Sequence, residues 1–232
     1  MRVLGLIPAR GGSKGVPGKN NKLLNGTPLI GYTIASALAS RHISEVVVST
    51  DSEELAQISK ELGASVPFIR PATLATDSSP TLDTVIHAIE QLAATGLHFD
   101  AVCLLQPTVP FRQAEEIDAA IGKFKKSGAD SLISVREIPA KFNPHWAFEP
   151  TEGQDFLTIA TGETNIVARR QELPKSYYRD GSIYLTNTEI ITEKRSLYGQ
   201  RIAYHENNST PPINIDTAED WLKAEEYLNH ER

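Results

Sequence analysis

The sequence has 232 residues, a length that fits one large α/β domain with a sizeable core. Its 23 Lys and Arg against 29 Asp and Glu give a net charge of −6, which argues against nucleic acid as a partner. The single Cys103 excludes an internal disulfide, and no apolar run approaches the ~20 residues of a membrane-spanning helix. We therefore expect a soluble, cytoplasmic protein without a membrane partner.

Strand-like and helix-like segments alternate over the first 135 residues. Apolar runs predict strands at 3–7, 45–49, 66–69, 101–105 and 131–135. Amphipathic segments predict the helices between them, at about 28–40, 52–62, 81–95 and 114–126. This βαβ rhythm predicts a doubly wound, mostly parallel sheet with helices on both faces, an α/β fold of the Rossmann-like type.

The rhythm breaks after Val135. Residues 136–180 mix prolines, glycines, charges and short apolar pieces, and we expect them to form a protruding arm or lid. The regular pattern returns with strands at 181–186 and 202–204 and a closing helix at 218–228. The expected organisation is a single domain over residues 1–232 with the arm inserted in it.

A glycine-rich basic loop follows the first strand. Its members are Gly11, Gly12, Gly15, Gly18, Arg10, Lys14 and Lys19. Glycines let backbone N–H groups approach phosphate oxygens closely, and the cations offset phosphate charge. The loop is neither a Walker A motif nor a dinucleotide fingerprint. A flexible surface loop is the alternative, but the position after a strand, where open α/β sheets bind ligands, favours a phosphate site.

Further polar residues follow other strands. Asp51 follows the second strand, where it or Ser52 is expected to cap a helix. The run from Arg70 to Ser79 offers a cation and hydroxyls, with a surface loop as the alternative. Gln106 precedes a proline-stiffened turn that would aim it into the crevice, unless it is only a satisfied polar residue at a strand end.

Asn214 and Asp216 lie two residues apart in an extended stretch, so their side chains point to the same side. Two such oxygen-bearing side chains suit Mg²⁺, which also takes waters and substrate phosphates as ligands. The alternative is that Asp216, or Thr217, caps the closing helix.

Six segments occur in an order and at spacings that are typical of one family. They are residues 7–20, 48–51, 70–77, 104–112, 170–184 and 214–221, which together extend over nearly the whole chain. The sequence resembles the CMP-sialic acid synthetases, or N-acylneuraminate cytidylyltransferases, with their relatives for other nonulosonic acids. The resemblance implies transfer of CMP from CTP to the anomeric hydroxyl of an acidic nine-carbon sugar with release of pyrophosphate. It also implies Mg²⁺ as cofactor and a homodimer contacted through the arm at 136–180.

Two other functions stay open. One is a cytidylyltransferase for another sugar acid, such as the eight-carbon Kdo, or a related enzyme for another nucleotide. The other is a nucleotide-binding relative without catalysis, which Asn214 favours because the family carries aspartate there.

The resemblance assigns nucleotide contacts to specific residues. It implies that Arg10 and Lys19 contact the triphosphate and take part in catalysis, and that the backbone of Gly12 and Ser13 cradles phosphate oxygens. It also implies that Asn20 contacts the ribose or a phosphate of the nucleotide. The cytosine and ribose side is formed by Arg70, Asp77 and Ser79.

The resemblance also assigns the sugar and metal contacts. Gln106 should face the sugar, with Arg170, Gln171 and Lys141 near the acidic group. The last three lie in the arm, so a second subunit would supply them if the arm completes its partner's site. Asp216 is the stronger metal ligand and a catalytic residue, and Asn214 is the weaker ligand.

Overall fold

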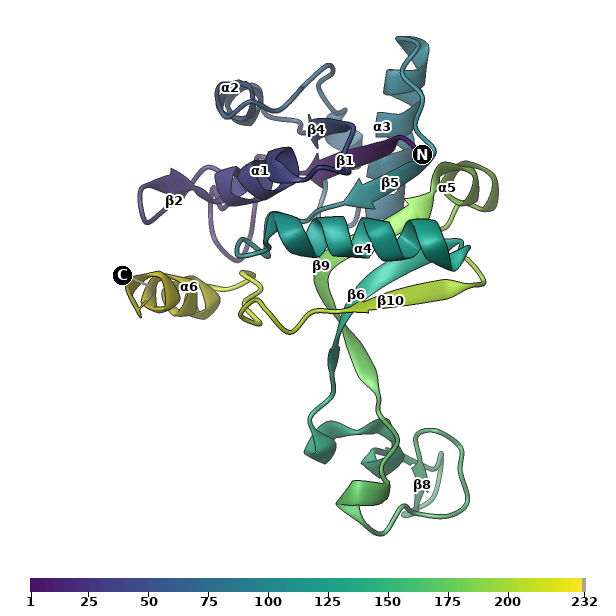
Figure 1. Ribbon diagram of the computed structural model, residues 1–232. Helices are drawn as coiled ribbons and strands as arrows, with labels where there is room; N and C mark the ends of the chain where they lie inside the picture. Colours follow the sequence, from purple (N-terminus) through teal and green to yellow (C-terminus); the bar gives the residue numbers. More distant parts are fainter. Residues whose placement is uncertain (231–232) are drawn as a thin grey trace.

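The computed structural model describes residues 1–230 and contains a six-stranded sheet in the order β10-β6-β9-β5-β1-β4 (Figure 1). The strands are β1 (Val3–Pro8), β4 (Glu45–Ser49), β5 (Ala101–Leu104), β6 (Ser131–Glu137), β9 (Tyr177–Asn187) and β10 (Ile202–Glu206). β9 is antiparallel to both of its neighbours, and the other pairs are parallel. The predicted fold class, an α/β fold with a mostly parallel sheet, is confirmed.

Helices cover both faces of this sheet (Figure 1). On one face lie α1 (Leu29–Ala39), α2 (Glu53–Glu61) and α4 (Ala114–Ser127), and on the other lie α3 (Thr81–Ala94) and α5 (Thr188–Lys194). Strand side chains alternate between the two cores: Ile7 packs in the first and Leu6 in the second. Both faces are therefore apolar, which explains the unbroken apolar run of β1.

Some local predictions were wrong. No strand forms at 66–69; Ser65 makes a single bridge to Val47, and Pro67 has no N–H to extend it. The sequence did not reveal α5, the antiparallel direction of β9, or the small hairpin of β2 (Leu23–Leu24) and β3 (Thr27–Pro28).

The last helix, α6 (Ala218–His230), packs against the loop that follows the first strand. Trp221 of this helix packs in a third apolar cluster with Val16, Phe111 and Ile215. This cluster holds the segment before α6 against the loops that follow β1 and β5.

The arm begins at the C-terminal end of β6, returns at the N-terminal end of β9 and projects away from the rest of the molecule (Figure 1). It consists of the short helices η2 (Ala140–Phe142), η3 (Pro144–Trp146) and η4 (Arg170–Glu172) and a hairpin of β7 (Phe148–Pro150) and β8 (Leu157–Ile159). It exposes large apolar side chains, namely Phe142, Phe148, Phe156, Leu157 and Ile166.

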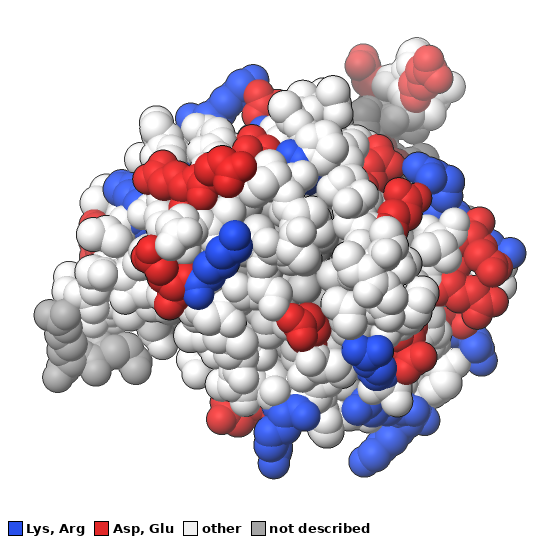
Figure 2. Space-filling model, turned by 90° about the horizontal axis from the view of Figure 1, so that it is seen from above, with Lys and Arg blue, Asp and Glu red and all other residues white. Residues whose placement is uncertain are grey.

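The surface carries mixed charge. On the face drawn in Figure 2, acidic and basic side chains are interspersed, without a continuous basic area. Among residues 1–230, no helix is long and apolar enough to span a membrane.

Candidate active site

The loop after β1 meets the segment before α6. A Cβ atom added to Gly15 would lie 2.0 Å from the backbone oxygen of Asp216, so a side chain at this position would force the two segments apart. Lys19 Nζ donates to the Ile215 carbonyl at 2.7 Å and lies 3.1 Å from Asp216 Oδ1. The chain thereby places two predicted catalytic residues in direct contact.

Asp216 does not cap the closing helix. Asp220 N donates to Thr217 Oγ1 at 3.2 Å, and Thr217 N donates to Asp220 Oδ2 at 2.9 Å. This reciprocal pair satisfies the beginning of α6. Asp216 therefore keeps its carboxylate for Lys19 and for Asn214, whose amide donates to Asp216 Oδ2 at 3.0 Å.

Asp51 also differs from the prediction of a helix cap. Ser52 caps α2 by accepting from Leu55 N at 3.3 Å. Asp51 Oδ1 instead accepts from Gly11 N at 2.9 Å and lies 3.8 Å from Arg70 Nη2. It thus ties the glycine-rich loop to the buried guanidinium of Arg70, a role that the sequence pattern did not indicate.

The first cavity, of about 250 Å³, lies between this loop, the 70–79 segment and the end of β5. Its wall includes all the predicted nucleotide-binding residues, which are Arg10, Gly12, Ser13, Lys19, Asn20, Arg70, Asp77 and Ser79. Asn20 is buried and donates to the Arg10 carbonyl at 2.9 Å, which shapes the loop. The structure therefore brings these residues together, while their individual roles stay predictions.

Two polar atoms of the first cavity's residues are buried without a partner. Within residues 1–230, Arg70 Nε and Thr108 Oγ1 make no hydrogen bond. Burial lowers the pKa of Arg70, and nearby Asp51 acts in the opposite direction. Unpaired buried donors are costly, so both atoms favour a polar ligand in this cavity.

Asp77 lies across the mouth of this cavity. Its carboxylate oxygens are 2.7 Å from Arg10 Nη2 and 2.7 Å from Lys14 Nζ. Hydrogen bonds from Lys14 and Arg10 lower the pKa of Asp77. In this structure the carboxylate therefore contacts the same cations that the sequence assigns to phosphate.

A second cavity, of about 400 Å³, adjoins the first. Gln106 and Thr81 are in the walls of both cavities, and Asn214 lines the second. Arg179 of β9 and Tyr198, which follows α5, also line the second cavity, and the sequence did not indicate them. Arg179 Nη1 donates to Tyr198 Oη at 2.9 Å, and within residues 1–230 no carboxylate forms an ion pair with it. A guanidinium that lines a cavity without a carboxylate partner can bind an anionic or strongly polar ligand.

Three predicted sugar-binding residues lie elsewhere. Lys141, Arg170 and Gln171 are in η2 and η4 of the arm, and none of them lines either cavity. Arg170 instead lines an arm cavity of about 320 Å³. Within one chain, the structure does not bring these residues to Gln106.

Asn214 and Asp216 supply the donor chemistry for a magnesium ion, although the described residues contain no cluster of three or more His, Cys, Asp or Glu. Asp216 offers a half-exposed carboxylate, and the amide nitrogen of Asn214 faces that carboxylate. This leaves the amide oxygen of Asn214 to accept a ligand. One carboxylate and one amide oxygen fit an ion that takes its other ligands from water and phosphate.

The mixed sheet, the basic loop after β1 and the adjoining cavities define an enzyme of the nucleotidyltransferase class. A family model described as cytidylyltransferase matches residues 4–230. The chain is 40% identical over 229 residues to a CMP-N,N'-diacetyllegionaminic acid synthase of Legionella pneumophila, covering 98% of this chain and 97% of that one. The chain belongs to the cytidylyltransferase family and, within it, to the CMP-nonulosonic acid synthetases.

One further relative supports this placement, and a solved structure supports the fold. A pseudaminic acid cytidylyltransferase of Campylobacter jejuni is 31% identical over 233 residues, which cover 100% of this chain and 99% of that one. The solved structure of a CMP:2-keto-3-deoxy-manno-octonic acid synthetase complexed with CTP has a TM-score of 0.75 at 18% identity and covers 100% of both chains. At that identity the second comparison supports the fold alone.

Proposed function

We propose that this enzyme transfers CMP from CTP to the anomeric hydroxyl of an acidic nonulosonic sugar and releases pyrophosphate. The observation that carries the proposal is the pair of adjoining cavities, with Gln106 in the wall of both. The first is lined by three cations and Gly12, and the second by Arg179. The names of the relatives at 31–40% identity support the substrate class.

In this proposal the first cavity holds CTP. Arg10 and Lys19 contact the triphosphate, and the backbone at Gly12 and Ser13 cradles its oxygens. The cytosine and ribose lie toward Arg70 and the 77–79 turn. Binding releases Arg10 and Lys14 from Asp77, because phosphate oxygens replace its carboxylate as their partners.

The transfer step forms one bond and breaks another. The anomeric oxygen of the sugar bonds to the α-phosphorus, the bond from that phosphorus to the bridging oxygen breaks, and pyrophosphate leaves with that oxygen. The hydroxyl proton passes to water. Lys19 stabilises the negative charge that develops on the phosphate oxygens, since its ammonium is already held beside the cavity by Ile215 and Asp216.

Asp216 and Asn214 would hold Mg²⁺. When bound, the ion would supply positive charge to the phosphate oxygens. Asp216 lines neither cavity, but its contact with Lys19, which lines the first, supports a metal position close to the phosphates.

The second cavity receives the sugar acid. Gln106 and Arg179 offer hydrogen-bond donors from the same chain. Lys141, Arg170 and Gln171 reach a sugar through a homodimer in which the arm of one subunit contacts the other. The exposed apolar side chains of the arm support such a contact, because isolated patches of this kind are typical of interfaces.

Since the reaction consumes CTP and Cys103 is a buried, free thiol, we place the enzyme in the cytoplasm.

The test is a substrate panel. Purified enzyme is given CTP and Mg²⁺ with neuraminic, deaminated, legionaminic, pseudaminic and eight-carbon acids, and pyrophosphate release is followed. We expect release with at least one nine-carbon acid and little with UTP in place of CTP. Release with the eight-carbon acid alone would reassign the substrate, and no release with any acid, despite CTP binding, would leave a nucleotide-binding protein.

A further inference from the structure

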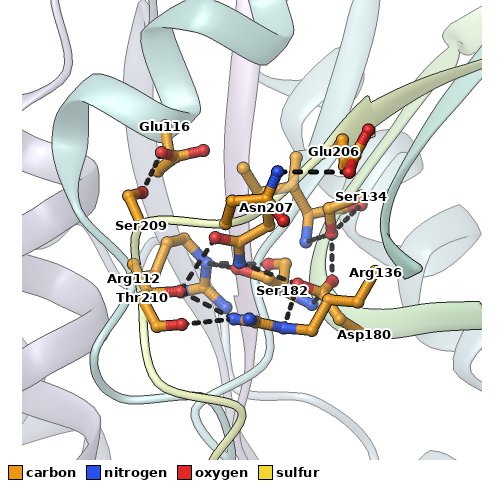
Figure 3. Close-up of polar contacts among 12 residues, drawn as sticks. Arg112, Glu116, Ser134, Arg136, Asp180, Ser182, Glu206, Asn207, Ser209 and Thr210 are labelled. Atoms are coloured by element: carbon orange, nitrogen blue, oxygen red, sulfur yellow. Dashed lines mark hydrogen bonds and ion pairs between the residues drawn. The ribbon is translucent and has the colours of Figure 1, made fainter. Parts of the chain in front are cut away.

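Arg112 is a buried arginine at the end of the loop that follows β5 (Figure 3). Only 2% of its surface is exposed. Its Nε donates to the Ser182 carbonyl at 2.7 Å, and its Nη2 donates to the Gln106 carbonyl at 3.1 Å. The guanidinium therefore joins the two chain segments that flank the second cavity.

The charge of Arg112 has no direct counterion. Among residues 1–230, no carboxylate forms an ion pair with it, and its Nη1 has no hydrogen-bond partner. Burial raises the pKa of neighbouring Cys103 to about 12, so that thiol stays neutral. Burial also lowers the pKa of Arg112 to about 10. A buried charge with incomplete partners is costly, so stability alone does not account for it.

The two partners of Arg112 matter for different reasons. Gln106 is in the wall of both cavities, and its backbone carbonyl is what Arg112 holds. Ser182 belongs to an irregular part of β9, where the pairing with β6 shifts between Ile133 and Val135. Gly181 makes this irregularity possible because its φ is +79°.

The irregular segment also positions Asp180 in the wall of the second cavity. Its carboxylate accepts from Ser182 N at 3.0 Å and from Asn207 Nδ2 at 2.7 Å (Figure 3). Arg112 thus connects Gln106 on one side of the cavity to the 180–182 segment on the other.

We propose that Arg112 is a positioning residue that acts through Gln106 and sets the width of the sugar cavity. It touches neither cavity itself. The proposal rests on the proposed function, because it takes the second cavity as the sugar site. Without Arg112 the Gln106 carbonyl keeps only the longer hydrogen bond from Val109 N, at 3.4 Å, and loses its link to the 180–182 segment, so the Gln106 side chain holds the sugar less firmly for attack.

The test is a double-mutant cycle between Arg112→Lys and Gln106→Ala, with steady-state kinetics for both substrates. We expect each single variant to raise the KM of the sugar acid about tenfold and to change the KM of CTP less than about twofold. If Arg112 acts through Gln106, the double variant will resemble Gln106→Ala alone, because the second change removes what the first one positions.

Arg136→Lys is the matched control. Arg136 is another arginine of the same polar network: its Nη2 donates to the Thr210 carbonyl at 2.6 Å, and its Nε lies 3.6 Å from Asp180 Oδ2 (Figure 3). It therefore contacts the 180–182 side of the second cavity but not Gln106, and we expect any change that Arg136→Lys makes in the KM of the sugar acid to add to that of Gln106→Ala. If Arg136→Lys were instead as non-additive with Gln106→Ala as Arg112→Lys is, the proposal would be overturned, since that would show a general effect of the network.

The remaining outcomes are also decisive. Additive effects in the cycle would overturn the proposal, and so would equal changes in both KM values. If Arg112→Lys fails to fold, Arg112→Gln is measured, and loss of the fold in both variants would assign Arg112 to stability alone. Absence of turnover in the wild-type enzyme with every sugar acid would instead contradict the proposed function.

Discussion

The nucleotide side and the sugar side of this enzyme are built differently. The glycine-rich loop beside the first cavity is already held by contacts within one chain, from Gly11 to Asp51, from Asn20 to Arg10 and from Lys19 to Asp216. The arm residues expected at the sugar lie outside both cavities. The proposed CTP contacts are therefore preorganised within one chain, whereas the sugar contacts expected in the arm would require a second subunit.

The largest effect on the nucleotide side is expected from Lys19→Ala. We expect kcat to fall by about 10²–10³, because the variant removes a charge from the wall of the first cavity, where we propose that the triphosphate binds. The melting temperature should change little, since the residue lies in a loop and not in either sheet core. Pyrophosphate release and thermal unfolding are the measurements. Near-normal kcat would remove Lys19 from the phosphate site.

Mixing experiments sharpen the comparison at the arm. If Arg170 serves the partner's site, a Lys19→Ala chain paired with an Arg170→Ala chain carries one intact site. Random exchange of two inactive variants should then restore about a quarter of wild-type activity, because half of the dimers contain one such site.

The control mixes Lys19→Ala with Arg10→Ala, whose residues both line the first cavity of one chain. Every chain of that mixture carries a defect in its own first cavity, so no dimer has an intact site and activity should not rise. Unmixed variants define the background. No recovery above it in the Arg170 mixture would show that the arm does not act across subunits.

A smaller effect is expected at the metal-binding pair. Asp216→Ala should weaken Mg²⁺ binding in the presence of a non-hydrolysable CTP analogue by about 10–100-fold, and Asn214→Ala by much less, because only the first removes a charged ligand. Calorimetric titration of Mg²⁺ measures both. Similar, mild losses would point to Lys19 as the main partner of Asp216, without a metal role.

The smallest effect is expected at the wall of the second cavity. Arg179→Met should raise the KM of the sugar acid about tenfold and leave the KM of CTP nearly unchanged, because Arg179 lines the second cavity but not the first. Gln106→Ala should show the same ranking. A larger rise in the KM of CTP for either variant would move that residue to the nucleotide side.

The parallel part of the fold could be predicted from the sequence because each βα unit combines a short apolar run with an amphipathic helix. One of these helices, α2, also has a capping residue, Ser52. Nothing comparable marks the direction of β9, which re-enters the sheet after the arm. The run at 66–69 was misleading, since its apolar residues pack against the cores without extending the sheet.

The position of the glycine-rich loop at a cavity could be predicted because it directly follows the first strand, and its role toward phosphate stays a prediction. Asp51 was misassigned because a polar residue after a strand has the same pattern whether it caps a helix or holds a neighbouring loop. Arg179 was missed because it lies in a charged, irregular stretch that resembles solvated surface. Only Gly181, next to Asp180, signalled the kink that turns this stretch toward the cavity.

The close contact between Gly15 and the Asp216 backbone has a consequence for shortened forms of the protein. All six strands of the sheet precede residue 207, but the segment that secures Lys19 follows it. A chain cut after residue 207 would therefore retain every strand and lose the groups that hold the Lys19 ammonium. The position of a side chain near the first strand thus depends on one of the most distant parts of the sequence.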